Sequence, residues 1–173
     1  AISLRPSLTY SDLLSIFHLS MLKLFRLIWV LTAVVFFAAL VLSYAFLPDR
    51  VGILADAEGI ANEFVSKETF FYSALAIFVV TNLMGSVFIG VMNAVPSTSG
   101  LYFHSENFKE STTSWFSSFF AIINVFLITA TLYVSLFNNQ GDYTISEFNF
   151  LIYIAPLLLA ASLFWLVFIV ARR

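Results

Sequence analysis

The sequence predicts an all-α integral membrane protein with four transmembrane helices and both termini in the cytoplasm. Of its 173 residues, 61% are hydrophobic and only 10% are charged, whereas soluble domains carry about 25% charged residues. A soluble domain of this length needs a polar outer shell, and this chain has too few polar side chains to build one. Four long apolar runs and an uneven distribution of Lys and Arg are the other two observations.

Each apolar run is long enough to cross a bilayer, because about 20 apolar residues span its hydrocarbon core. Lys23, Arg26 and Trp29 are expected at one interface of the first run and Tyr44 at the other, in the usual order of basic and aromatic anchors. Pro48 is expected to end the first helix. The predicted spans are about 24–47, 69–94, 114–137 and 148–171, which together form one transmembrane domain over residues 24–171.

Residues 1–23 precede the first span and are predicted to form an N-terminal interfacial segment. Leu13, Phe17 and Met21 fall on one helical face, opposite Asp12. This pattern is typical of a helix that lies along a membrane surface. The alternative is that the segment simply extends the first spanning helix.

Lys and Arg favour one orientation of the four spans. The side of the membrane that holds both termini and the 95–113 loop receives six basic residues, one of them at the start of the first span, whereas the other side receives only Arg50 and Lys67. The positive-inside rule therefore predicts that both termini face the cytoplasm and that the loops 48–68 and 138–147 face outward. The predicted location is the cell inner (plasma) membrane, which the chain crosses several times. The six residues are Arg5, Lys23, Arg26, Lys109, Arg172 and Arg173.

Small and polar residues mark one face of the second span and one face of the third. Small residues let helices approach closely, and Asn amides can form hydrogen bonds between helices. We predict that the two faces pack on each other; a small polar pathway lined by Asn82, Asn93 and Asn124 is the alternative. The predicted packing residues are Asn82, Ser86 and Gly90 in the second span, and Ser117, Ala121 and Asn124 in the third, within a seam that also includes Ser114, Ile128, Thr131 and Ser135.

The loop after the first span combines Pro, Gly and charged residues, and reads LPDRVGILADAEGIANEFVSK over residues 47–67. It resembles the loop of the SdpI-like immunity proteins and their relatives of unknown function. In that family, Leu-Pro after the first helix is followed by an Ile-Pro, a His, an aromatic residue and Asn or Asp, then by Gly, an acidic or amide residue, a further aromatic residue and a final Lys. The positions that match without gaps are Leu47, Pro48, Val51 (in place of Ile), Asp56, Gly59, Asn62, Phe64, Ser66 and Lys67.

The resemblance implies a bacterial inner-membrane protein that acts in toxin immunity or signal relay. It departs from the family at Gly52, Leu54 and Ala55, where the family has Pro, His and an aromatic residue, so no role that needs this His is expected. A purely structural reading is the alternative, in which Pro and Gly make turns and the charges solvate the loop. The predicted recognition residues are Pro48, Asp49, Arg50, Asp56, Gly59, Asn62, Ser66 and Lys67.

The chain carries little chemistry for catalysis. It has no Cys, which excludes thiolate ligands and nucleophiles. His104 and Glu106 supply fewer ligands than a metal site needs, and no catalytic Ser or phosphate-binding motif occurs. No Asp, Glu, Lys or His lies deep in an expected span, which argues against a proton-coupled transporter. We therefore expect a protein that is not an enzyme and has no metal site or cofactor. With a net charge of −2 and no basic patch, it is not expected to bind nucleic acid.

Two functions remain as expectations. The first is a recognition or signalling protein of the SdpI-like type, with the loop 48–67 as its outward element. The second is a structural or accessory subunit of a larger inner-membrane complex, such as a respiratory or secretion assembly. The expected partners are the lipid bilayer and either other membrane protein subunits or further copies of the chain.

Overall fold

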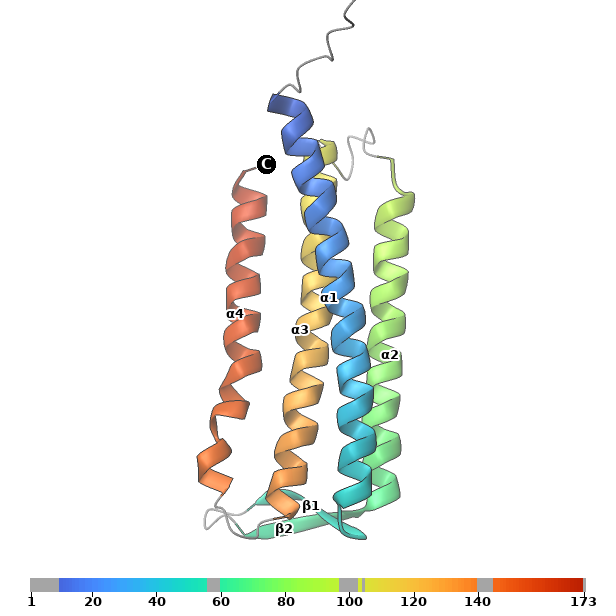
Figure 1. The fold of residues 1–173 in the computed structure, drawn as a ribbon, viewed down its shortest axis with the longest axis vertical. Coiled ribbons are helices and arrows are strands. Elements are labelled where there is room, and N and C mark those ends of the chain that lie inside the picture. The colour runs from blue at the N-terminus through green and yellow to red at the C-terminus, as the bar shows by residue number, and fades with distance from the viewer. Residues whose placement is uncertain (1–9, 56–59, 97–102, 104, 140–144, 173) are drawn as a thin grey trace, which may run out of the picture.

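Four long helices form an elongated bundle in the computed structural model, which describes residues 10–55, 60–96, 103, 105–139 and 145–172 (Figure 1). The start of α1 and the end of α4 lie at the same end of the bundle, and a β-hairpin crosses the other end. The helices are α1 (Tyr10–Phe46), α2 (Lys67–Ala94), α3 (Glu106–Asn138) and α4 (Phe150–Ala171). The hairpin strands are β1 (Arg50–Ala55) and β2 (Ala61–Ser66), and a 3-10 turn, η1 (Ile145–Phe148), precedes α4.

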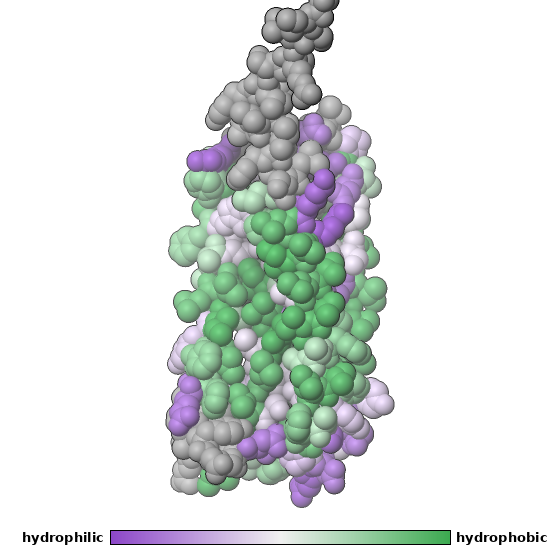
Figure 2. All heavy atoms as spheres, viewed as in Figure 1, coloured by the Kyte–Doolittle hydropathy of each residue, from purple (hydrophilic) through white to green (hydrophobic). Residues whose placement is uncertain are grey.

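All four helices are long and apolar enough to cross a membrane. The qualifying segments are Met21–Phe46, Lys67–Ala94, Glu106–Asn138 and Phe150–Ala171. On the face shown in Figure 2, a broad apolar band covers the middle of the bundle, and hydrophilic residues gather towards both ends. Large apolar side chains point outward in this band, and Phe164 is 77% exposed. The prediction of four apolar helices is confirmed, and the arrangement is that of a multi-pass membrane protein.

The first helix is continuous from Tyr10 to Phe46. No Pro or Gly lies between residues 10 and 46, so nothing interrupts the backbone hydrogen bonds before the span begins. Residues 10–23, which are predicted to belong to an interfacial segment, are thus helical and continuous with the first apolar helix. Residues 1–9 lie outside the described part of the chain.

Helix α3 is the centre of the bundle. It contacts α1, α2, α4 and β1, and its most extensive contact is with α1. It begins at Glu106, well before the expected start near residue 114, because the Ser105 hydroxyl accepts a hydrogen bond from the Phe108 N–H (3.2 Å) and caps the helix. Most of its buried residues are small or polar, as expected for a helix surrounded by other helices.

Helix α4 packs on α3 through a buried hydrogen bond. The Trp115 indole N–H donates to the Ser162 carbonyl at 2.8 Å. Higher in the bundle, the rings of Phe25 and Trp165 lie 5.1 Å apart and connect α1 to α4. Pro156 lies inside α4 without ending it, as membrane helices permit.

Candidate functional site

The chain between α1 and α2 forms an antiparallel β-hairpin, which corrects the expectation of an irregular loop. Side chains alternate between the two faces of each strand, and Val51 is fully buried while Arg50 is exposed. β-Branched and aromatic residues that favour strands occur in both halves of the segment. The register sets Arg50 opposite Ser66, Val51 opposite Val65 and Gly52 opposite Phe64, with an irregularity after Gly52.

The last residue of α3 anchors this hairpin. The Asn138 Oδ1 atom accepts a hydrogen bond from the Gly52 N–H (2.7 Å), and its Nδ2 donates to the Gly52 carbonyl (2.9 Å). The side-chain amide thus satisfies both backbone groups, as a neighbouring strand does. Only Gly fits at position 52, because an added Cβ would lie 2.7 Å from the Cβ of Ala61.

Both basic residues of the hairpin segment lie over aromatic rings. The Arg50 guanidinium is 5.2 Å from the centre of the Phe64 ring, and the Lys67 ammonium is 4.8 Å from that of Tyr44. Such cation–π contacts hold the two cations against the protein. The Lys67 N–H also donates to the Asp49 carbonyl (3.1 Å), which closes the base of the hairpin.

The predicted recognition residues fall into three groups. Ser66 and Lys67 have structural contacts, since the Ser66 hydroxyl accepts from the Thr69 N–H (3.1 Å) and caps α2. Four others lie on the exposed surface of the segment: Pro48, Asp49, Arg50 and Asn62. Asp56 and Gly59 lie outside the described residues.

A second cluster of polar side chains lies inside the bundle, near the middle of α2 and α3. The amides of Asn82 and Asn124 exchange two hydrogen bonds, at 2.9 Å and 3.2 Å. The Trp29 indole N–H donates to Asn82 Oδ1 (2.8 Å), and Asn124 Nδ2 reaches the Thr32 hydroxyl (3.5 Å). Asn124 has no exposed surface. The cluster therefore joins three helices by hydrogen bonds in an apolar setting, where unpaired amides are costly.

The structure brings together only part of the predicted packing face. Asn82 meets Asn124, and both Ser117 and Ala121 are buried. Gly90 and Ser86 are exposed, and no atom lies within 4 Å of a Cβ placed on Gly90. The prediction that Gly90 packs on the third span is therefore wrong.

Gly85 of α2 lies against Phe120 of α3, a contact that the sequence did not indicate. A Cβ at this position would be 2.8 Å from the ring of Phe120. Gly85 and Ile89 are the buried residues of α2. The face of α2 that contacts α3 carries Gly85 and Ile89. The predicted face, with Ser86 and Gly90, lies next to it around the helix axis.

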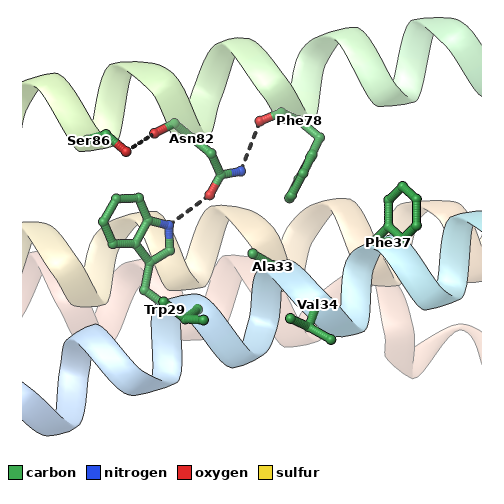
Figure 3. Close-up of a pocket in the computed structure, with 8 residues that line it drawn as sticks. Trp29, Ala33, Val34, Phe37, Phe78, Asn82 and Ser86 are labelled. Carbon is green, nitrogen blue, oxygen red and sulfur yellow. Dashed lines mark hydrogen bonds between the residues drawn. The ribbon is translucent and has the colours of Figure 1, made fainter.

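An open groove runs beside the polar cluster, between α1 and α2 (Figure 3). Its volume is about 490 Å³, and most of the residues that line it are apolar, with Asn82 and Ser86 among them as polar residues. Asn82 Nδ2 donates to the Phe78 carbonyl and the Ser86 hydroxyl to the Asn82 carbonyl, both at 2.9 Å. Together with the bonds that Asn82 forms with Trp29 and Asn124, these bonds engage the polar side chains of the wall, so the groove offers a mainly apolar surface.

Sequence reasoning also missed the roles of Trp29 and Asn138. Trp29 was expected to anchor the helix at the membrane interface, whereas its indole binds Asn82 between two helices. Asn138 was assigned to a polar loop, whereas it ends α3 and holds the hairpin. Neither role has a local signal, because each partner is distant in the sequence.

Comparisons with protein-family models, with curated proteins and with solved structures find no match to this chain. The class is therefore defined by the structure: a four-helix protein whose helices can cross a membrane, with a β-hairpin anchored at one end of the bundle. Among the described residues there is no group of three or more His, Asp or Glu side chains that could hold a metal ion.

Proposed function

We propose that the protein is a non-enzymatic, multi-pass protein of a bacterial inner membrane that recognises a partner or relays a signal through its hairpin. The observation that carries the proposal is the anchored hairpin itself. Asn138 fixes β1 to the bundle, while Asn62, Glu63 and Phe64 of β2 are exposed. A fixed backbone with exposed side chains suits recognition, because little conformational entropy is lost on binding.

The proposed orientation places this hairpin on the outer side of the membrane. It puts six of the eight Lys and Arg residues on the side that holds both termini, and the two of the hairpin segment on the other side. The positive-inside rule then favours cytoplasmic termini. The SdpI-like resemblance of residues 47–67 agrees with an outward recognition element, and it extends the proposal to immunity against a toxin.

Site-specific photocrosslinking tests this proposal in intact cells. A benzoylphenylalanine placed at Asn62 in β2 is expected to form an adduct with a partner that reaches the outer face. The matched control is the same probe at Phe164, which is 77% exposed on α4 in the apolar band. Absence of any adduct at Asn62 would contradict the recognition role. For the immunity form, a deletion strain is expected to be more sensitive to a secreted toxin.

The second candidate function is an accessory subunit of a larger inner-membrane complex. The exposed face of α2 favours it, because Ser86, Gly90 and Asn93 are small or polar residues that do not pack inside this chain. Small residues usually lie where a neighbouring helix approaches closely. A probe at Gly90 that crosslinks to a larger membrane subunit, with no adduct at Asn62, would favour this function over recognition.

A further inference from the structure

The two outer edges of the hairpin differ in their hydrogen bonding. In an antiparallel pair, opposite residues either exchange both backbone hydrogen bonds or direct both groups outward. The N–H and the carbonyl of Gly52 bond to the Asn138 amide, so they point away from β2. Gly52 lies opposite Phe64. The N–H and the carbonyl of Phe64 therefore point away from β1, to the outer edge of β2.

A hydrogen bond at the base of the hairpin independently shows which residue pairs are hydrogen-bonded and which direct their backbone groups outward. The Lys67 N–H donates to the Asp49 carbonyl (3.1 Å), which makes Asp49–Lys67 a hydrogen-bonded position. Bonded and non-bonded positions alternate along the ladder. Counting from this position, Val51–Val65 is bonded, and Gly52–Phe64 is again a pair whose backbone groups point outward.

Among the residues that the structure describes, the outer edge of β2 is unpaired at Phe64, whereas that of β1 is covered by Asn138 at Gly52. Within the described residues, no strand or side chain bonds to the outward backbone groups of Phe64. The Phe64 side chain is 49% exposed, and Asn62 and Glu63 beside it are also exposed. An open edge of this kind is a template for another strand.

We propose that the outer edge of β2 binds an extended, basic peptide segment of a partner, which adds to the hairpin as a third strand. The inference rests on the proposed recognition role of the hairpin and names the mode of binding. Backbone groups at a strand edge are satisfied best by an extended chain, with side chains at alternate positions adding specificity.

Charge selects a basic segment over a second copy of this chain. Residues 48–68 contain five acidic residues and only two basic ones. Both basic residues already lie over aromatic rings of the protein. A second β2 edge would bring a second Glu63 into the interface, where like charges repel.

Peptide binding to the full-length protein in lipid nanodiscs tests the proposal. The probe is a fluorescent peptide of about ten alternating Lys and Val residues, long enough for one strand. Two further probes carry backbone N-methyl groups at odd or at even positions, and a fourth replaces Lys with Glu. The unmodified Lys peptide is expected to bind, and one of the two N-methylated peptides and the Glu peptide should bind at least about tenfold more weakly.

Two variants of Phe64 separate backbone pairing from side-chain contact. Phe64→Pro removes the outward N–H but leaves the β1–β2 ladder intact, since Pro is tolerated at a strand edge. Phe64→Leu keeps the N–H and removes the ring. The Pro variant should weaken binding by about tenfold and the Leu variant by less than about threefold. Retained amide protection at Val51 would show that the hairpin is still formed in both.

The outcomes distinguish this inference from the recognition role. Equal binding of the plain and both N-methylated peptides would overturn strand addition, even if the Pro variant failed to fold. Failure of the Lys peptide to bind would overturn it as well. In either case an adduct at Asn62 in cells would still support recognition by the hairpin, whereas the absence of that adduct would contradict the proposed function itself.

Discussion

Asn138 and Gly52, which lie 86 positions apart in the sequence, are joined by two hydrogen bonds of 2.7 Å and 2.9 Å between one side-chain amide and one peptide unit. A further bond from Asn138 Nδ2 to the Val134 carbonyl (2.8 Å) holds this amide against its own helix. The end of α3 therefore fixes the position of β1. This contact connects the four-helix bundle to the hairpin that we propose for recognition.

Replacing Asn138 by Leu is expected to loosen the hairpin without unfolding the helices. The variant leaves the Gly52 N–H and carbonyl without partners, which costs about 1–3 kcal/mol for each buried group. Hydrogen exchange at the Val51 amide should therefore accelerate by about tenfold or more. The matched control is Asn149→Leu, because the Asn149 side chain makes no capping hydrogen bond at the start of α4. Unchanged protection of Val51 in Asn138→Leu would contradict the anchoring role.

The two glycines of α2 should respond in opposite ways to the same added methyl group. Gly85→Ala places a Cβ 2.8 Å from the Phe120 ring, so either the ring or the helix must move. Such overpacking costs about 1–3 kcal/mol, and the melting temperature in detergent should fall. Gly90→Ala meets no atom within 4 Å and should be neutral or slightly stabilising. Equal losses in the two variants would mean that α2 presents a different face to α3.

The contributions of the Asn82 and Asn124 amides to the free energy of unfolding should be coupled. Either single change to Leu leaves a partner amide unpaired in an apolar region, with an expected loss of about 1–3 kcal/mol in the free energy of unfolding. The double variant removes both amides, so its loss should be smaller than the sum of the two single losses. A double-mutant cycle by denaturant titration in mixed micelles measures this coupling, and strictly additive losses would argue against the paired geometry.

The sequence predicted the four helices because their apolar runs and the lengths of those runs are local properties. It also predicted that Asn82 and Asn124 share a packing face, since both the helical period and the polarity of Asn in a span are visible in the chain. The predicted start of the third helix lies later than the observed start because the first turns of α3 contain Asn107, Lys109 and Glu110. These polar residues resemble a loop, although Ser105 caps them as a helix.

The hairpin and the close contact at Gly85 depend on tertiary structure. Pro48, Gly52 and the charged residues around them are typical of a loop. The contact that fixes the first strand, between Asn138 and Gly52, joins residues 86 positions apart and leaves no local pattern in the sequence. Gly85 and Gly90 look alike in the sequence. The presence of Phe120 beside Gly85, and of open space beside Gly90, follows only from how α2 rotates against α3.

We propose that the hairpin and the Ser105 end of the bundle lie on opposite sides of a membrane, with the hairpin outside. The chain has no Cys, so a single introduced Cys reports its own position. In intact cells, a membrane-impermeant maleimide should label Asn62→Cys and should label Ser105→Cys only after permeabilisation. Labelling of Ser105→Cys in intact cells, with Asn62→Cys protected, would contradict the claim.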